Sequence, residues 1–516
     1  MKAPGHTARF VLWFTAIAAC LLAACGEISN PEGYAGFDAF VEQTRQAYRV
    51  PGAAVAVVRD TGVVFIKGYG LRSISGAAPV DPATKFQIAS NSKFMTGAVI
   101  GTLVDAKRTT WDQPLKEHYP ALTLATAKAT SMVSFRDLLS HWSGLRAYDG
   151  DLLSRLGLGK AEIIRRAQFM PLDSWRDQAR YSNMGYFIAG EIGAQISTLQ
   201  ALDWETHISQ ALLEPLGMTR SSARPLDLFA DDNHVAGHRL KNGRVELMDL
   251  ETDLMGPAGA VVSTVDDMGR WVRMLLNRGQ LDGRVVLQPA TVDEICKNSV
   301  ETGNGGFLGE PGAGFGLGTE TYTFLGRRVV TKNGALDGVR TYVALIPDLK
   351  IGIVVLANLN MTVFPEAVVA RFLEDNIGPA GKDLQADLRD NQQKQWEFVS
   401  SPPIYPSAPV KLPVGLASLA GVYTNAIYGD FTLTVEGATL KIVSSAPKAY
   451  TGKLTHWDGL RFLLEWPDPD DVRGLVEFQP SPGLTRITGF IGVMPDATYR
   501  KDHQLFIIDY GQFTRN

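Results

Sequence analysis

Cysteine is scarce in this chain, which contains three such residues among 516. Cys20 lies inside a segment that we expect to be removed, and Cys25 directly follows that segment. Cys296 is then the one cysteine in the body of the protein, so no second cysteine there could form an intrachain disulfide with it. Because Cys296 follows Val292 and Ile295 in an amphipathic helical pattern, we expect a buried thiol and not a catalytic one.

Runs of like charge are also absent. The formal net charge is −4, the isoelectric point is near 6.1, and no block of five or six like charges occurs. A basic face that could follow a phosphate backbone is therefore not expected, which excludes nucleic acid as a partner. With 45% hydrophobic and 20% charged residues, the chain has the composition of a globular protein. Its length corresponds to about three domains.

The one strongly apolar run stands at the N-terminus. Residues 1–24 join Lys2 and Arg9 to an apolar stretch and end in Leu22-Ala23-Ala24, directly before Cys25. This order is typical of a signal peptide, with an N-terminal membrane anchor as the alternative. The last four residues also resemble the lipobox of bacterial lipoproteins. That resemblance implies that Cys25 carries a lipid and that the protein is exported, tethered at the periplasmic face of a bacterial membrane or present in the periplasm.

Apolar periodicity predicts an α/β domain in residues 25–376. Two apolar runs at 53–58 and 63–69 indicate an antiparallel hairpin, residues 90–107 are periodic like a helix, and 130–220 is mostly helical. Further strands are expected at 314–323, 340–346 and 351–357. The two ends of the domain thus form one antiparallel sheet, flanked by helices, and the middle forms an all-α subdomain.

The C-terminal part reads differently. Residues 377–414 are polar and then rich in proline, which predicts a linker that packs little of its own surface. Residues 415–516 contain short alternating runs separated by Gly, Pro and Asp, including one at 504–508. We therefore predict a separate small all-β barrel.

Ser90 and Lys93 are the first candidate for catalysis. A lysine three positions after a serine lies on the same helical face one turn away, where it could remove the hydroxyl proton. The start of a helix also offers free backbone N–H groups to a developing oxyanion. The spacing is weak by itself, because Ser445 and Lys448 repeat it around a proline. The alternative is a polar helix start with Ser90 as its N-cap.

Tyr181-Ser182-Asn183 is the second candidate, directly before a helical run. A phenol placed between two lysines could move protons, and an amide could hold a substrate carbonyl. The alternative is an N-cap beside a packed tyrosine.

Lys332-Asn333-Gly334 is the third candidate, after a strand-like segment. A cation on a strand could pair with a carboxylate, and the glycine would let substrate approach the backbone. Lys241-Asn242-Gly243 repeats the same residues, and both copies could be simple hairpin turns. Order and spacing do not choose between the two lysines.

Together these segments resemble the serine β-lactamase and penicillin-binding-protein superfamily, most of all the class C β-lactamase-related serine hydrolases of the D-alanyl-D-alanine carboxypeptidase and esterase branch. The resemblance extends over about residues 35–375 and rests on the ordered segments FQIASNSKFMTG, SFRDLLSHWSGL, YSNMGYFIAG, GPAGAVVSTVDDM and KNGALDGVRTYVALIP. It implies a β-lactamase/transpeptidase-like fold. It also matches Lys332 to the family's Lys-Thr-Gly strand, which leaves Lys241 in a turn. The segment after Gly415 is similar to the lipocalin-like domain that follows some members.

The resemblance implies roles for these residues. Ser90 would be the acylated nucleophile, with Lys93 and Tyr181 exchanging its proton. Asn183 would contact substrate or Lys93, and Lys332 would tune Tyr181 and attract an anionic group. The backbone N–H groups of Ser90 and Ala335, next to Gly334, would form the oxyanion hole.

One position departs from the family pattern. The β-lactamases and carboxypeptidases carry a hydroxyl after the strand lysine, where it helps to bind the substrate carboxylate. Asn333 provides an amide instead. This difference argues against efficient β-lactam hydrolysis.

Other candidates are weaker. His234 and His238 have the spacing of a helical metal pair but lie in strand-like text with Gly237 between them, so we expect no metal site. His141 would suit a Ser-His-Asp triad, yet no Gly-x-Ser-x-Gly turn occurs, which favours a structural histidine at the end of a helix.

The sequence therefore predicts an exported serine hydrolase that acts on a small molecule or peptide, namely a D-amino-acid peptide, a β-lactam or a simple ester. No cofactor is expected. The alternative is a non-catalytic protein of the same fold that binds penicillin or peptidoglycan fragments.

Overall fold

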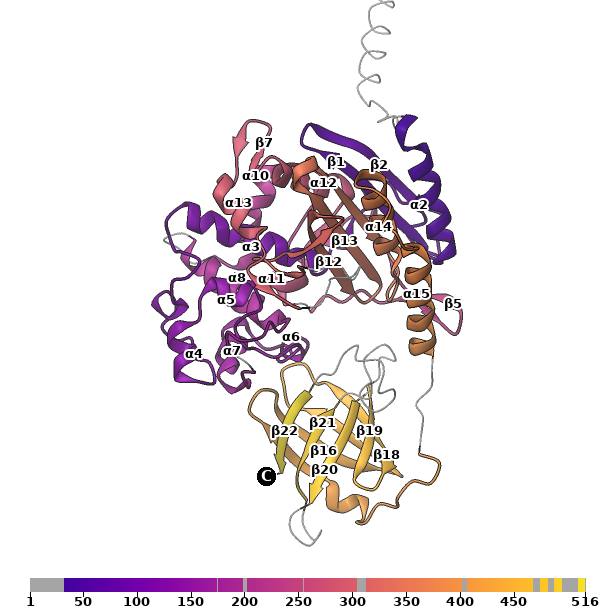
Figure 1. Cartoon of the computed structure of the whole chain (residues 1–516). Coiled ribbons are helices and arrows are strands. Elements are labelled where there is room, and N and C mark those ends of the chain that lie inside the picture. The colour runs from indigo at the N-terminus through magenta and orange to yellow at the C-terminus, as the bar shows by residue number, and fades with distance from the viewer. Residues whose placement is uncertain are drawn as a thin grey trace, which may run out of the picture.

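A computed structural model of the chain describes residues 32–173, 175–197, 202–253, 255–303, 312–400, 406–466, 474–480, 487–493 and 509–515. The expected signal peptide, Cys25 and the strand at 504–508 lie outside these ranges. Two bodies are visible in Figure 1: a larger one of helices around a sheet, and a barrel below it. No helix within the described ranges is both long and apolar enough to span a bilayer.

The sheet of the larger body has eight antiparallel strands. In spatial order they are β2 (Gly62–Gly70), β1 (Gly52–Arg59), β14 (Ile351–Ala357), β13 (Val339–Ile346), β12 (Arg327–Leu336), β11 (Glu320–Phe324), β10 (Gly314–Phe315) and β9 (Val300–Glu301). Strand β1 pairs with β14 so that Ala53 lies opposite Ala357. The prediction that both ends of the domain build one sheet is confirmed.

Both faces of this sheet are buried, which explains why β1 is apolar at almost every position. On one face, Ala53, Val55 and Val57 share a core with α2 (Ala35–Ala47) and α14 (Phe364–Asn376). On the other face, the intervening β1 residues pack toward α12 (Val265–Leu276) and the helical block. The two-residue period of a strand assigns alternate side chains to the two layers.

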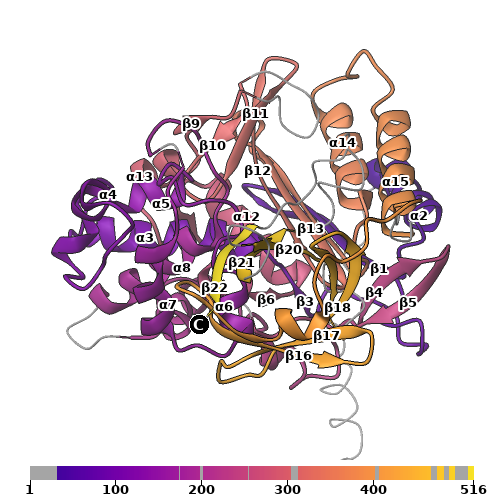
Figure 2. The same ribbon diagram turned by 90° about the horizontal axis from the view of Figure 1, so that it is seen from below.

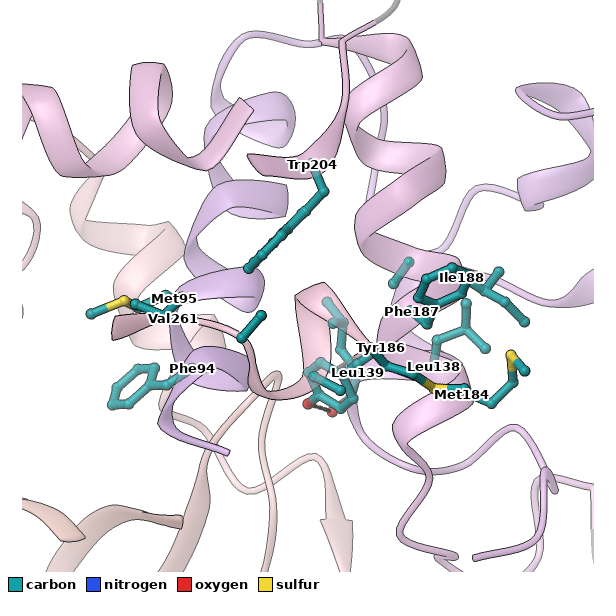
Figure 3. Packing of buried hydrophobic residues seen from close by; sticks show 14 of the residues in the cluster. Phe94, Met95, Leu138, Leu139, Met184, Tyr186, Phe187, Ile188, Trp204 and Val261 are labelled. Atoms are coloured by element: carbon teal, nitrogen blue, oxygen red, sulfur yellow. Dashed lines mark hydrogen bonds between the residues drawn. The ribbon is translucent and has the colours of Figure 1, made fainter. Parts of the chain in front are cut away.

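The predicted helical block is confirmed. Its helices are α3 (Asn91–Asp105), α4 (Ala127–Met132), α5 (Phe135–Leu139), α6 (Leu152–Arg155), α7 (Lys160–Arg166), α8 (Asn183–Ile196), α9 (Trp204–Ile208) and α10 (Glu214–Leu216), followed by α11 (Gly256–Gly259) and α13 (Pro289–Ile295). Figure 3 shows the packing at its centre, where Phe94 and Met95 of α3 lie near Val261 and where α8 contributes Met184, Tyr186, Phe187 and Ile188 beside Leu138 and Leu139 of α5. The Tyr186 hydroxyl donates to the Leu139 carbonyl in this layer.

Short strand pairs complete the larger body. They are β3 (Phe86–Gln87) with β6 (Val262–Ser263), β4 (Gly237–Lys241) with β5 (Arg244–Met248), and β7 (Gln280–Leu281) with β8 (Arg284–Val285). Strand β3 precedes α3 in the chain, with Ile88, Ala89 and Ser90 between them.

Helix α3 approaches a neighbouring turn backbone to backbone. A Cβ at Gly97 would lie 1.9 Å from the Leu317 carbonyl oxygen, and one at Gly318 would lie 2.4 Å from the Lys93 carbonyl oxygen. Gly318 also has a φ of +105°, which favours glycine. The turn at 316–319, which leads into β11, is therefore seated on α3 with little freedom to move.

The predicted linker is wrong in its first half. Residues 384–400 form α15 (Leu384–Ser400), which lies beside α14 in both views (Figures 1 and 2). Leu384, Leu388 and Gln392 are buried, and the Gln392 amide oxygen accepts hydrogen bonds from Thr362 and Val363. The abundance of polar residues concealed a helix with a narrow buried face.

The predicted C-terminal barrel is confirmed. Eight strands close in chain order, namely β15 (Gly421–Asn425), β16 (Gly429–Glu436), β17 (Thr439–Ser444), β18 (Thr451–Asp458), β19 (Arg461–Glu465), β20 (Gly474–Pro480), β21 (Ile487–Val493) and β22 (Asp509–Arg515). Strand β15 pairs with β22, which removes the free edges of the sheet.

The barrel contacts the helical block directly, below α6 and α7 (Figures 1 and 2). The Lys448 backbone N–H donates to the Leu156 carbonyl at 3.0 Å, and the Lys448 ammonium pairs with Asp253 at 2.6 Å. The Tyr428 hydroxyl accepts from the Gly150 N–H at 3.2 Å. Ser445 and Lys448 thus belong to a loop that contacts the helical block. They do not lie in a helix, in agreement with the proline between them.

The close approach at Gly97 provides a test of the fold. Gly97→Ala should lower the free energy of unfolding by about 2–3 kcal/mol, because the new methyl group must displace backbone and not a flexible side chain. Gly36→Ala, in helix α2 with nothing within 4 Å of its Cβ position, is the matched control and should gain up to about 1 kcal/mol. Thermal unfolding followed by circular dichroism measures both. Equal effects of the two substitutions would contradict the close packing of α3.

Candidate active site

Ser90 stands at the start of α3, but its side chain does not cap the helix. The preceding residue, Ala89, has a φ of +51°, a conformation that costs a non-glycine residue energy and that accumulates at functional turns. The Thr341 hydroxyl donates to the Ile88 carbonyl at 2.9 Å and accepts from the Asn91 amide at 2.9 Å, which holds the turn to β13. Ser90 thus occupies the N-cap position of α3, as the alternative interpretation expected, but its side chain caps no N–H of the helix and its hydroxyl is free to face other groups.

Lys93 lies where the helical spacing predicts. Its ammonium donates to Ser90 Oγ at 3.0 Å and to the Ala258 carbonyl of α11 at 2.7 Å. The side chain is fully buried. A fully buried amine whose hydrogen-bond partners here are a neutral hydroxyl and a carbonyl is a poor place for a positive charge.

Tyr181 reaches the same serine from the other side. Its hydroxyl donates to Ser90 Oγ at 2.8 Å. Ser182 caps α8 by accepting from the Gly185 N–H, so the cap interpretation holds for Ser182. Tyr181 is the residue directly before this N-cap. The ammonium groups of Lys93 and Lys332 lie 4.9 and 5.0 Å from the centre of the Tyr181 ring. Tyr181 is thus the phenol between two lysines that the sequence suggested.

The choice between the two Lys-Asn-Gly segments is settled by their positions. Lys332 lies on β12 and reaches Tyr181, whereas Lys241 ends β4. Asn242 and Gly243 then form the β4–β5 hairpin turn with φ values of +50° and +74°. Only Lys332-Asn333-Gly334 belongs to the site.

The two lysines shift the titration of the groups around Ser90. Burial lowers the pKa of Lys93, and the positive charge of Lys332 lowers it further, against an opposing effect of Tyr181. Burial alone would raise the pKa of Tyr181, but the charges of Lys332 and Lys93 outweigh it and bring that pKa below its ordinary value. Both neighbours of Ser90 can therefore release a proton closer to neutral pH than usual.

Lys332 itself stays charged. Burial acts to lower its pKa, but the Glu320 carboxylate and Tyr181 raise it above the ordinary value. The Lys332 ammonium contacts Glu320 Oε1 at 2.5 Å, and the Asn333 amide donates to Glu320 Oε2 at 3.2 Å. Glu320 begins β11, one strand away from β12.

Asn183 lies at the edge of the site, but its partner differs from the expected ones. Its amide donates to Asp151 Oδ2 at 2.7 Å. Asp151 is the residue directly before α6. Burial is the main cause that raises the pKa of Asp151 to about 7. Asp151 also interacts electrostatically with Lys93, so it contributes to the charge balance around Ser90.

Gly334 and Ala335 pass close to the serine turn on β12. A Cβ at Gly334 would lie 2.5 Å from the Ile88 carbonyl oxygen and 2.9 Å from the Ala89 Cβ, so no larger residue fits there. Ala335 follows with an exposed side chain, opposite Arg340 of β13. The strand thus runs beside the turn that carries Ser90, as an oxyanion hole made of Ser90 and Ala335 would require.

His141 is a structural residue, as predicted, but it forms part of the wall of the site. Its Nδ1 accepts from the Ser182 N–H at 3.0 Å, and its ring centre lies 4.5 Å from that of Tyr181. Burial, aided by Lys332 and Lys93, keeps the pKa of His141 well below its usual value, so the ring is neutral.

Three contributors escaped the analysis of the sequence: Asp151, the Ala258 carbonyl and Glu320. Each lies outside a recognisable motif and enters the site only through folding. For Glu320 a faint signal existed, since it is a charged residue inside the strand expected at 314–323.

The remaining candidates lie apart from the site. His238 Nδ1 hydrogen-bonds the Asn358 carbonyl at 2.8 Å and His234 faces the Asp231 carbonyl, while no cluster suited to a metal ion occurs in the described ranges. Cys296 is buried and unpaired, and burial raises the pKa of its thiol to about 12.

Comparison with known families agrees with this geometry, because residues 37–375 match the β-lactamase family. The chain belongs to the β-lactamase family. The resemblance noted in the sequence and the fold it implies are confirmed. Residues 406–491 match a second family, a domain of unknown function termed DUF3471.

Two curated relatives and one solved structure are similar to this chain at 20–25% identity. Protein flp of Staphylococcus aureus (strain COL) is 25% identical over 335 residues, which cover 64% of each chain. The match thus spans less than two thirds of that relative. Unguisins hydrolase ungD of Aspergillus violaceofuscus is 24% identical over 454 residues, or 80% of this chain and 78% of ungD. The octameric penicillin-binding protein homologue of Pyrococcus abyssi superposes with a TM-score of 0.60 at 20% identity, covering 93% of this chain and 99% of that one.

The charge of Lys332 gives a test that does not depend on which group is the base. The rate of Ser90 labelling by a fluorophosphonate should depend on pH. Lys332→Met should shift that pH profile to higher pH by about one unit or more. The sign follows because Lys332 lowers the pKa of both Lys93 and Tyr181, so its loss raises both. The matched control is Lys241→Met, in the Lys-Asn-Gly of the β4–β5 hairpin, which should leave the pH profile of labelling unchanged. A profile unmoved by Lys332→Met would contradict the electrostatic role of Lys332.

Proposed function

We propose that this protein is a serine hydrolase that cleaves a small amide or ester through an acyl-enzyme on Ser90. One observation carries the proposal: Ser90 Oγ lies between the Lys93 amine at 3.0 Å and the Tyr181 hydroxyl at 2.8 Å. A hydroxyl relieved of helix capping and placed between two groups of lowered pKa is suited to nucleophilic attack.

In the first step, Ser90 Oγ attacks the substrate carbonyl carbon while its proton passes to neutral Lys93 or to ionised Tyr181. A C–O bond to Ser90 forms and the carbonyl π pair moves to oxygen. The backbone N–H groups of Ser90 and Ala335 are the proposed donors to that oxyanion. When the carbonyl reforms, the C–N or C–O bond to the leaving group breaks, and the leaving group takes the proton from Tyr181 or Lys93.

In the second step, water repeats the sequence on the acyl-enzyme. The same base removes a proton from the water, the oxygen adds to the acyl carbon, and the bond to Ser90 breaks as its Oγ regains a proton. The acid product leaves. Both Lys93 and Tyr181 contact Ser90 Oγ, so the proton has a short path in either direction.

The substrate belongs to one of three classes: a D-amino-acid peptide, a β-lactam or a simple ester. Asn183, Lys332, Gly334 and Ala335 are the proposed substrate-binding residues. A relative named unguisins hydrolase supports hydrolysis as the general activity of this chain.

Ser90→Ala tests the nucleophile. It should reduce turnover of short-chain nitrophenyl esters by at least about 1,000-fold and abolish labelling by a fluorescent penicillin or a fluorophosphonate. Ser445→Ala is the matched control, since Ser445 is exposed and also stands three positions before a lysine. Undiminished turnover by Ser90→Ala would overturn the assignment. Stoichiometric labelling without any turnover of nitrocefin, D-alanyl peptides or esters would favour the alternative, a protein of this fold that only binds.

Export is a separate part of the proposal. We propose that residues 1–24 are a signal peptide and that Cys25 carries the lipid that tethers the protein at the periplasmic face of a bacterial membrane. In a bacterial host, Cys25→Ala should eliminate incorporation of radiolabelled palmitate and release the protein from the membrane fraction. Cys296→Ala is the control, because its thiol is buried. Unchanged labelling of Cys25→Ala would exclude this anchor.

A further inference from the structure

The strand that should attract a substrate anion already has an internal one. Glu320 uses Oε1 for the Lys332 ammonium at 2.5 Å and Oε2 for the Asn333 amide at 3.2 Å. Lys332 and Asn333 are the two donors that β12 would otherwise offer to a carboxylate beside the scissile bond. Glu320 therefore engages both before any substrate arrives.

The position of Glu320 is set by the fold. The turn at 316–319 directly before it is seated on α3, where Gly318 meets the Lys93 backbone. The Thr319 hydroxyl also donates to the Ile295 carbonyl at 2.9 Å. Across the sheet, Glu320 lies opposite Thr331, the residue before Lys332. This turn and the pairing with β12 fix the backbone of Glu320 next to Lys332, so its carboxylate stays within reach of the Lys332 ammonium.

Exposure decides what an incoming molecule would meet. The Lys332 side chain is 2% exposed, whereas that of Glu320 is 27% exposed. The accessible member of the pair is thus the negative one. A substrate carboxylate at this edge would have to displace Glu320 from Lys332 or lie next to a like charge, and both cost free energy.

The next cation along the same hairpin is also engaged. Arg340, opposite Ala335, pairs with Glu366, whose side chain is fully buried. Arg155 pairs with Glu251 at 2.6 Å and lies 3.6 Å from Asp337, two residues after Ala335. The cations that flank this end of β12 therefore have internal carboxylates as partners.

We propose that Glu320 is a specificity-determining residue that directs the enzyme to substrates without a carboxylate on the leaving group. This inference rests on the proposed function and narrows its substrates. Neutral esters and amides, or those with a cationic leaving group, are accepted. Free peptide C-termini and β-lactams, whose carboxylate lies near the scissile bond, are disfavoured.

Three N-acetyl-D-alanine aryl esters test the proposal, with phenol, 3-hydroxybenzoate or 3-(trimethylammonio)phenol as the leaving group. The first two phenols have similar reactivity, so their ratio of kcat/KM reports recognition of charge. The unmodified protein should hydrolyse the carboxylate ester at least about 10-fold less efficiently than the phenyl ester. Glu320→Gln should bring that ratio to within about 3-fold of unity by raising kcat/KM for the carboxylate ester.

The ratio separates specificity from a general structural effect. If Glu320→Gln disturbs Lys332 or Tyr181, all three esters lose rate together and the ratio does not move. Glu246→Gln is the matched control, since Glu246 pairs with Arg239 on the β4–β5 hairpin, away from Lys332, and it should leave the ratio unchanged.

Two results would overturn the role of Glu320: a preference of the unmodified protein for the carboxylate ester, or a ratio insensitive to Glu320→Gln. Ser90→Ala tested on the same esters distinguishes failure of this inference from failure of the proposed function. Turnover that depends on Ser90, with a ratio that does not depend on Glu320, would support the proposed serine hydrolase and contradict the role of Glu320 in specificity. Turnover that does not depend on Ser90 removes both.

Discussion

The site depends on one constraint, which is that two lysine side chains must share a nearly water-free space around a single phenol. Lys93 and Lys332 are both buried, and each ammonium lies about 5 Å from the Tyr181 ring. Two positive charges in such a place repel each other, so the protein must neutralise one of them. Glu320 holds the charge on Lys332, and burial then favours loss of the proton from Lys93. The asymmetry between the lysines follows from this division.

That arrangement requires several elements to meet within a few ångströms. Helix α3 brings Ser90 and Lys93, the loop before α8 brings Tyr181, α11 brings the Ala258 carbonyl, and β12 brings Lys332. Glycines at 97, 318 and 334 permit the close backbone contacts on which these meetings depend. The core beneath them is large and continuous, so a shift of α3 would be felt by the whole site. Stability and chemistry are therefore coupled at this helix.

The barrel adds a second level of support. Its contacts with Gly150 and Leu156 lie on either side of Asp151, which holds Asn183 at the edge of the site. The C-terminal domain thus borders the segment that forms one wall of the candidate active site. The local sequence pattern alone predicted that a barrel exists, because alternating runs separated by turn residues can be recognised without knowledge of distant contacts. Its seat on α6 and α7 came from long-range contacts that no local pattern encodes.

The sequence by itself predicted most of the secondary-structure elements and the candidate groups around Ser90. Within the helical pattern of residues 90–107, the spacing of Ser90 and Lys93 places both on one face, and the apolar runs at both ends of the domain predicted a shared sheet flanked by helices. Tertiary structure alone decided which Lys-Asn-Gly lies beside Tyr181, that the Ser90 side chain does not cap α3, that α15 packs on α14, and that Glu320 contacts Lys332. The physical reason is the same in each case. Periodicity and spacing act over a few residues, whereas the distance from Glu320 to Lys332, or from Tyr181 to Ser90, depends on strand register and on close backbone contacts between remote segments.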